Sequence, residues 1–352
     1  MLRRKYEITR VHMSGEKANT GMLIAKILYI IKFIFLVVPL LLQLRKRENE
    51  FIQFEQVFMF PLSIFTRVFL RVKTIIDDFN LLTPDYTFLP KPLLALIDRI
   101  AVMSCDTIAT ASPLSLKYLT RQFPGKVIVH VPNGIKVIEE HSIDWQKSKT
   151  EKITSLFVGN MTFHQNREAV ANLLRIADLL AGSSPNMKIE IVGGPLSHIR
   201  TLLHCQSVKS GFVRFRGFLS QEDLTDSYLK ADIGLLPFFE DTPMVGGERT
   251  KALEYLKYGL IVLSGPEGIG NLKGLAPNDH YLVGHDMKSY AALLDRVSKS
   301  VDSYYPIGQR GRESAHKFYS WNETVKPLVR IARAFPQELN HDHAVSESNE
   351  EA

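Results

Sequence analysis

The feature that most constrains this chain is an alternation of short apolar runs, typical of buried strands, with longer helical patterns. It occurs in two blocks, and a polar stretch at 136–152 separates them. Strands and helices in regular succession indicate parallel sheets covered by helices. We therefore expect an α/β fold of two doubly wound, Rossmann-like domains that face each other across a cleft.

The strands expected from these runs lie at 6–13, 50–55, 73–77, 106–112 and 126–131 in the first block, and at 154–159, 188–194, 213–217, 232–237 and 260–265 in the second. Helical patterns fill most of the intervals, including 195–204 and 248–258. The predicted organisation is an N-terminal domain over 1–135, a linker over 136–152, a C-terminal domain over 153–318, a helix over 319–336 that returns to the first domain, and a disordered acidic tail over 337–352.

The composition is that of a folded globular protein, because 45% of the 352 residues are hydrophobic and 23% are charged. Two cysteines, Cys105 and Cys205, are too few for a disulfide scaffold or a structural zinc site and fit a reducing compartment, so we expect a cytoplasmic protein. The net charge of +6 favours anionic partners. No nucleic-acid motif accompanies it, and nucleic acid is not expected as a partner.

The apolar stretch 23–44 is the one candidate membrane segment, although Lys26, Lys32 and Pro39 interrupt it. Three interpretations remain open: a buried helix of the first domain, a helix that lies on a membrane surface, or a spanning helix. The basic residues 45–47 at its end favour the second over the third. Peripheral contact with the cytoplasmic face of a membrane is therefore a hypothesis.

The densest chemical signal is the segment GGERTKALEYLKYGLIVLSGPEGIG at 246–270. Two glycines precede a helix that carries Arg249, Lys251 and Glu254 near its start. A helix N-terminus with two cations is suited to an anion. Glu254 falls among apolar positions, where a ligand with hydroxyl groups would give it partners; the alternative is an ordinary salt bridge on a solvated face.

Other glycines stand where strands of the second block end: Gly159 before Asn160, the pair Gly193 and Gly194, and Gly217. Together they suggest the floor of a ligand site, because ligands of open parallel sheets bind at the carboxyl ends of the strands. The glycines at 268–274 do not have the spacing of a dinucleotide-binding loop.

Several segments, taken in order, resemble a known family: VPNGI (131–135), FVGNMTFHQNREAV (157–170), IVGG (191–194), VRFRGFLSQEDL (213–224), GGERTKALEYLKYG (246–259) and HKFYSWNETVKPL (316–328). The chain is similar to retaining glycosyltransferases of the GT-B, "group 1" type (family 4-like), in the variant that reads G-G-x-R-x-K-x-L-E at its donor helix. The resemblance covers about 70–335.

The resemblance implies roles residue by residue. Arg249 and Lys251 correspond to contacts of the donor diphosphate, and Glu254 to the acid that holds the ribose hydroxyls. At the end of strand 73–77, Asp77 and Asp78 are candidates to position the acceptor, with turn capping as an equal alternative. The resemblance and the strand-end glycines together nominate the remaining donor-binding positions: Gly159, Asn160, His164, Asn166, Gly193, Gly194, Phe215, Gly217, Gly247 and Glu248.

The sequence also departs from the family pattern. The first acid of the family's E-x7-E element falls on a glycine at 246, and Glu248 is two residues out of register. Asn160, His164 and Asn166 stand in the loop where many relatives carry Arg and Lys. A strand and a glycine-rich loop that open the family's first domain have no counterpart before 6–13, so the first domain is expected to lack its first strand.

The implied reaction is transfer of a hexosyl group from a nucleotide diphosphate sugar to a glycan, polysaccharide or lipid-linked acceptor, with retention of configuration. No cofactor is expected, and the sequence has no D-x-D motif for a metal-bound diphosphate. A second hypothesis, which the missing first strand supports, is a catalytically silent GT-B-like subunit that binds a partner enzyme or a glycan.

Overall fold

The structure is a computed structural model that describes residues 51–55, 60–77, 90–111, 113–138, 152–180, 186–204, 208, 210–239, 250–269 and 272–331. The predicted strand at 6–13, the apolar segment 23–44 and the acidic tail lie outside these residues. Within the described ranges, every helix is too short or too polar to cross a bilayer.

The first domain is built on a parallel four-stranded sheet in the order β1-β2-β3-β4. Its strands are β1 (Phe51–Glu55), β2 (Lys73–Asp77), β3 (Thr107–Thr110) and β4 (Val127–His130). Its helices are α2 (Phe60–Phe65), the π-helix η4 (Thr66–Leu70), α4 (Lys91–Ser104) and α5 (Pro113–Gln122). Ile75, Ile76 and Ile108 are completely buried, as expected for parallel strands covered by helices.

The second domain contains a parallel six-stranded sheet in the order β10-β9-β8-β5-β6-β7. Its strands are β5 (Ile153–Val158), β6 (Met187–Val192), β7 (Val213–Gly217), β8 (Ile233–Leu236), β9 (Ile261–Ser264) and β10 (Leu282–Val283). The chain proceeds outward from β5 to β7 and then returns to place β8 on the other side of β5. The switch point of the sheet therefore lies between β5 and β8, where ligands of doubly wound sheets bind.

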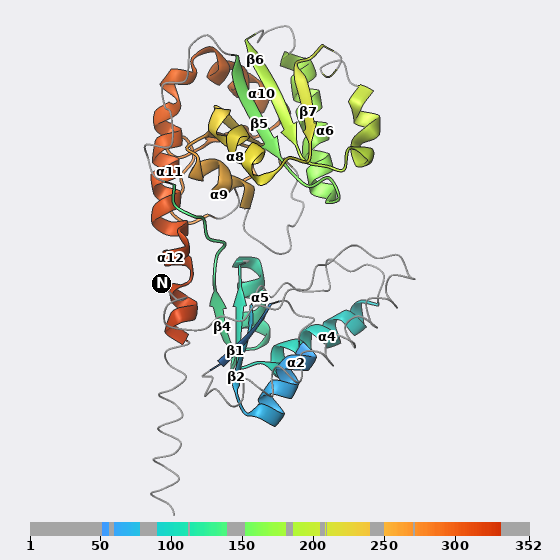
Figure 1. Cartoon of the computed structure of the whole chain (residues 1–352), viewed down its shortest axis with the longest axis vertical. Helices are drawn as coiled ribbons and strands as arrows, with labels where there is room; N and C mark the ends of the chain where they lie inside the picture. The colour runs from blue at the N-terminus through green and yellow to red at the C-terminus, as the bar shows by residue number, and fades with distance from the viewer. Residues whose placement is uncertain are drawn as a thin grey trace, which may run out of the picture.

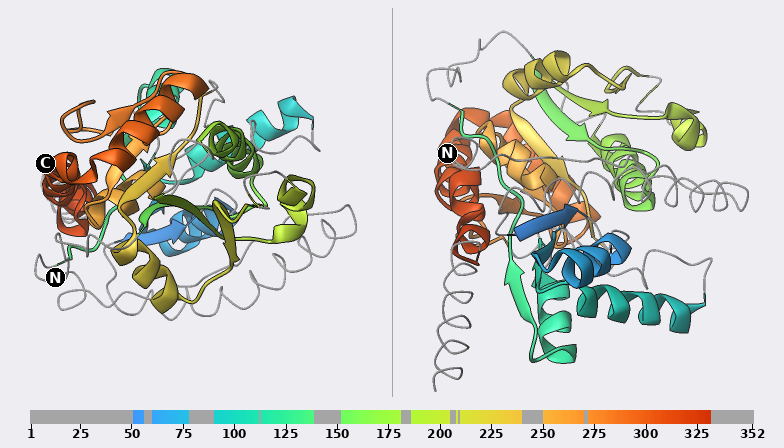
Figure 2. Two further views of the ribbon diagram at one scale, coloured as in Figure 1. Left: turned by 90° about the horizontal axis from the view of Figure 1, so that it is seen from above. Right: turned by 60° about the horizontal axis from the view of Figure 1, so that its bottom comes forward.

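Helices cover this sheet on both faces and continue along one side of the molecule (Figures 1 and 2). They are α6 (His164–Leu180), η6 (Leu196–His204), α8 (Gln221–Lys230), α9 (Thr250–Lys257), α10 (Met287–Lys299), η7 (Val301–Ser303), α11 (Tyr305–Tyr319) and α12 (Trp321–Thr324). The segment after β4 contacts the junction of α11 and α12, since the backbone N–H of Ile135 donates to the carbonyl of Tyr319 at 2.7 Å and that of Trp321 donates back to Ile135 at 3.2 Å.

The α/β fold with two parallel-sheet domains is confirmed, and each predicted strand within the described residues is present. Ser220 caps the N-terminus of α8, because its hydroxyl accepts from the backbone N–H of Asp223. The predicted helix at 195–204 is instead a 3₁₀ helix with a kink at Ile199. Ile199 is completely buried, and tertiary packing overrides the regular helical geometry there.

Candidate functional site

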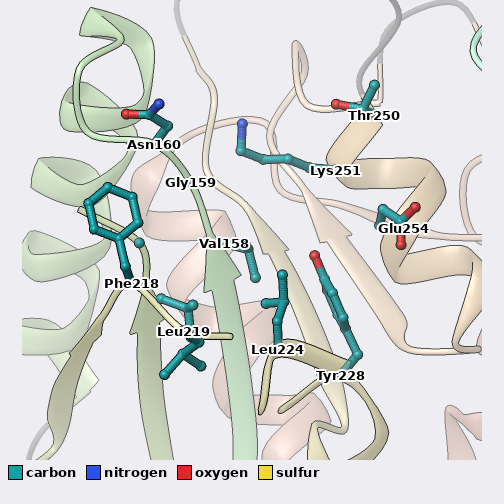
Figure 3. A pocket seen from close by; sticks show the side chains of 12 residues that line it. Val158, Gly159, Asn160, Phe218, Leu219, Leu224, Tyr228, Thr250, Lys251 and Glu254 are labelled. Carbon is teal, nitrogen blue, oxygen red and sulfur yellow. The ribbon is translucent and has the colours of Figure 1, made fainter. Parts of the chain in front are cut away.

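A pocket of about 310 Å³ opens at the carboxyl ends of β5 and β6, beside the switch point of the sheet (Figure 3). Five segments of the second domain meet there: the ends of the two strands, the loop after β7, one face of α8 and the first turns of α9. Its lining residues are Val158, Gly159, Asn160, Val192, Gly193, Phe218, Leu219, Leu224, Tyr228, Thr250, Lys251 and Glu254.

The α8 side of the pocket is apolar and aromatic. Leu224 and Tyr228 stand four residues apart on α8 and so share one helical face. The Tyr228 ring stacks on Tyr258, with centroids 4.8 Å apart, and meets Tyr255 edge-on at 6.0 Å. Burial raises the pKa of Tyr228 far above its ordinary value. The hydroxyl therefore stays neutral and can both donate and accept a hydrogen bond.

The α9 side of the pocket carries the charges. Lys251 extends from α9 toward the side on which Asn160 lies (Figure 3), and Glu254 stands one turn further along the helix. A Glu254 carboxylate oxygen accepts from Lys257 Nζ at 3.0 Å, and this Nζ also lies 4.9 Å from the Tyr258 ring centroid. Lys257 is itself 13% exposed, so surrounding packing holds its ammonium group, which in turn orients Glu254.

The sequence pattern suggested that neighbouring apolar residues would enclose Glu254. The structure shows that they do not. Ala252, Leu253 and Leu256 are buried in the core, whereas the Glu254 side chain is 37% exposed and faces the pocket. The expected salt bridge is present, and Glu254 also lines a cavity, so its role toward a ligand stays a prediction. The pair with Lys257 uses one carboxylate oxygen in the described structure and fixes the orientation of the group.

The glycines at the ends of β5 and β6 interlock. Gly193 has φ +123°, and a Cβ built on it would lie 1.9 Å from the carbonyl oxygen of Gly159. The N–H of Gly159 donates to Val192 at 3.0 Å, and that of Gly193 donates to Gly217 at 2.7 Å. These N–H groups are used within the protein, so the role of both glycines is close packing that keeps the floor of the pocket open.

Side chains from α6 hold the loop that follows β5. Asn166 Nδ2 donates to the carbonyl of Asn160 at 2.6 Å, and Arg167 Nη1 donates to the carbonyls of Met161 at 2.9 Å and Thr162 at 2.8 Å. The Asn160 side-chain oxygen accepts from the Thr162 backbone N–H at 2.9 Å. This hydrogen bond fixes the Asn160 side chain at the pocket edge, where its amide NH₂ group can donate hydrogen bonds.

A further hydroxyl joins α9 to the sheet. The Tyr255 hydroxyl accepts from the backbone N–H of Val158 at 2.9 Å, and the side chain is completely buried. Because Val158 and α9 belong to opposite walls, this hydrogen bond helps to fix the width of the pocket.

The structure brings together five of the residues that the sequence nominated, namely Gly159, Asn160, Gly193, Lys251 and Glu254. Gly194 lies beneath the Phe218 ring, and a Cβ added to this glycine would lie 2.8 Å from the ring edge. Four nominated residues — Asp78, Gly247, Glu248 and Arg249 — lie outside the described residues.

The other nominated residues do not line the pocket. The His164 side chain is 75% exposed and lies 3.8 Å from Glu168, and Asn166 is buried beneath the loop. Phe215 and Gly217 belong to β7, beside the wall that Phe218 forms. Their donor-binding roles remain predictions.

Four residues of the site were not predicted from the sequence, namely Leu224, Tyr228, Thr250 and Lys257, which anchors Glu254. The four-residue spacing on the capped helix α8 places the first two on one helical face but does not distinguish a pocket wall from the core. The three-residue spacing from Glu254 to Lys257 is typical of a salt bridge on one helical face and could have indicated Lys257. Among the described residues, no group of three potential metal ligands occurs.

Comparison with known proteins places these features in context. Residues 152–300 match the family described as "Glycosyl transferases group 1". Sucrose-phosphate synthase from Thermosynechococcus elongatus is 15% identical over 82% of this chain and 74% of its own, with a TM-score of 0.61. The chain has a GT-B-like fold.

Two further structures show the same architecture. Anabaena HepE, solved in complex with UDP, has a TM-score of 0.65 at 12% identity and covers 84% of this chain and 82% of its own. A UDP-forming trehalose-phosphate synthase from Burkholderia xenovorans has a TM-score of 0.61 at 11% identity and covers 85% and 77%. No curated protein matches the chain significantly in sequence. The family match is confined to residues 152–300, and the structural neighbours show the fold.

Proposed function

We propose that this protein is a group 1 glycosyltransferase that binds a nucleotide diphosphate sugar in the pocket between β5, β6, α8 and α9. The observation that carries the proposal is the presence of both a cation, Lys251, and a carboxylate, Glu254, on the pocket wall opposite the floor formed by Gly159 and Gly193. A nucleotide diphosphate sugar offers a diphosphate, ribose hydroxyls and a flat base. The pocket has a chemically matched group for each.

In this proposal Lys251 binds the diphosphate, together with Arg249 from the preceding residues. The Glu254 carboxylate accepts hydrogen bonds from ribose hydroxyls, and Lys257 keeps it oriented toward them. Phe218, which is 69% exposed at the pocket wall, offers a face on which a base can stack. HepE was solved in complex with UDP-glucose, which supports a nucleotide-sugar donor for a protein of this fold.

The chemical role proposed for the cations is electrostatic. Departure of the nucleotide diphosphate concentrates negative charge on the leaving phosphate, and fixed positive groups stabilise that charge in the transition state. Transfer with retention follows from the family resemblance, which also implies that a phosphate oxygen takes the acceptor proton. Asp78 remains the proposed contact for the acceptor, which we propose is a glycan, a polysaccharide or a lipid-linked sugar on the cytoplasmic side of a membrane.

The proposal is tested by calorimetric titration of the purified protein with UDP, GDP and ADP, followed by assays of nucleotide release from the corresponding sugars. We expect one nucleotide to bind and its sugar to be turned over. Glu254→Gln and Lys251→Ala should each weaken nucleotide binding about tenfold, because each removes a charge-assisted contact. Asp226→Ala is the matched control, since Asp226 pairs with Lys230 on an exposed part of α8 and lies outside the pocket lining.

The outcomes separate the two candidate functions. Nucleotide binding that Glu254→Gln and Lys251→Ala weaken, with turnover, supports the glycosyltransferase. Absence of both nucleotide binding and turnover across the panel contradicts it and favours the silent subunit. Binding that all three variants leave unchanged places the nucleotide elsewhere and contradicts the assignment of this pocket.

A further inference from the structure

Helix α4 of the first domain exposes a row of large apolar side chains. Leu93, Leu96, Ile100 and Met103 are 43%, 53%, 38% and 60% exposed. Their spacing of three, four and three residues places them on one side of the helix. Residues on the other side, Ala101 and Val102, are completely buried. The helix is therefore apolar on the face that it turns away from its own core.

A second exposed apolar row lies on the neighbouring elements α2 and η4. Ile64, Val68 and Phe69 are 38%, 61% and 63% exposed. Arg67 Nη1 donates to the carbonyl of Met103 at 3.0 Å, which joins η4 to the C-terminal end of α4. The segment formed by α2 and η4 lies beside α4 at the edge of the first domain in two views (Figures 1 and 2).

The concentration of these side chains is the unusual feature. Seven of the fourteen large apolar side chains that are exposed in the described part of the chain stand on α2, η4 and α4. Scattered exposed apolar residues need no explanation, whereas a contiguous group marks an interaction surface. We call the surface formed by Ile64, Val68, Phe69, Leu93, Leu96, Ile100 and Met103 the apolar face.

The exposed charges on the described residues of α2, η4 and α4 and on Arg71 are of one sign. Arg71 and Arg99 are exposed, and Arg67 is 48% exposed. The described residues of α2 and η4 include no acid, and the one acid of α4, Asp98, is 6% exposed. Asp106, just after α4, is largely buried and lies 3.5 Å from Arg67. The rim of the apolar face is therefore cationic.

Large apolar side chains bordered by arginines, on described residues of α2, η4 and α4 that expose no carboxylate, match the chemistry of an anionic membrane surface. The apolar groups enter the boundary between headgroups and acyl chains, while guanidinium groups remain at the level of the phosphates. We propose that the apolar face docks this protein onto membranes that contain anionic lipids. The docking surface differs from the segment 23–44 that the sequence nominated, and it is distinct from the donor pocket, which belongs to the other domain.

The test is co-sedimentation of the full chain with vesicles of phosphatidylcholine alone and of phosphatidylcholine mixed with phosphatidylglycerol. We expect binding to the mixed vesicles that decreases as salt increases. The double variant Phe69→Glu with Met103→Glu should lower the partition coefficient about tenfold or more. Leu179→Glu on α6 is the matched control, because Leu179 is 60% exposed on the second domain, and it should bind as the wild type does.

A second variant separates charge from apolar contact. Arg71→Gln with Arg99→Gln should lower binding to the mixed vesicles about tenfold and should change binding to phosphatidylcholine little. All substituted residues are exposed, so unchanged thermal unfolding is expected and is measured on each variant.

Three results overturn the proposal. The first is wild-type protein that binds neither vesicle. The second is vesicle binding that both double variants retain, which would place the contact elsewhere, for example at 23–44. The third is self-association of the wild type, without vesicle binding, that Phe69→Glu with Met103→Glu abolishes, because the apolar face would then join two copies of the chain.

Discussion

Substitution of Gly193 by alanine is the sharpest test of how the pocket floor is built. Gly193 has φ +123°, and an added Cβ would lie 1.9 Å from the carbonyl oxygen of Gly159. Real Cβ atoms essentially never approach a heavy atom closer than 3.0 Å, so the two strand ends would have to separate by about 1 Å. The obstructing atom belongs to the backbone and has no rotamer by which to move away.

The magnitude follows from two separate costs. A positive φ disfavours a residue with a Cβ by about 1–2 kcal/mol. Forced displacement in a closely packed region adds about 1–3 kcal/mol. We therefore expect Gly193→Ala to lower the free energy of unfolding by about 2–5 kcal/mol and, by separating the ends of β5 and β6, to abolish nucleotide binding in the pocket.

Urea denaturation followed by fluorescence measures the stability change, with two glycines as matched controls. Gly211 also has a positive φ, +75°, but nothing lies within 4 Å of its Cβ position, so Gly211→Ala should cost only about 1–2 kcal/mol. Gly125 has neither a positive φ nor a close neighbour, and Gly125→Ala should be neutral or slightly stabilising. The reasoning fails if Gly193→Ala is no more destabilising than Gly211→Ala.

Three further predictions concern the same fold. Tyr255→Phe removes the acceptor of the buried Val158 N–H and should lower the free energy of unfolding by about 1–3 kcal/mol, measured in urea. Asp286→Ala breaks the capping box that Asp286 forms with Ser289 at the start of α10 and should lower the midpoint temperature of thermal unfolding. Burial, and then the guanidinium of Arg312 on α11, lowers the pKa of His316 below its ordinary value of 6.5. The contribution of the neutral His316 side chain to stability is therefore present above pH 6.5 and is lost as the pH falls below that value.

Each of these predictions has a result that contradicts it. A Tyr255→Phe protein as stable as the wild type would show that water or a rearranged backbone satisfies the Val158 N–H. Equal effects of Asp286→Ala and of Asp302→Ala, a nearby acid without a side-chain cap, would show that the capping box contributes nothing. For His316, lowering the pH from about 7.5 to about 5.5 should reduce the urea midpoint less in His316→Gln than in the wild type. An equal reduction in both proteins contradicts the pKa argument.

Local sequence patterns were sufficient for most elements of the second domain. The apolar runs at 154–159 and 260–265 become central strands whose residues are mostly buried, whereas the predicted strand at 213–217 lies at the sheet edge and is only partly buried. The strand β10, only two residues long, was not predicted, since two residues establish no periodicity. Its existence depends on pairing with β9.

The candidate site was less predictable than the fold. Gly159, Asn160 and Gly193 stand at strand ends, and a topological rule is enough to nominate them. Tyr228 was not nominated, because an aromatic residue on an amphipathic helix has the same local pattern whether it packs in the core or lines a pocket.

The amino-acid sequence by itself determined the alternation of strands and helices, the parallel sheets and the cation and carboxylate of α9, because those depend on periodicity and short spacings. Only the tertiary structure decided that Glu254 is oriented by Lys257, that Gly193 must pack against Gly159 and that α2, η4 and α4 carry a common apolar face. Each of these depends on which surfaces meet after the chain folds, and contacts between distant segments leave no periodic signal in the sequence.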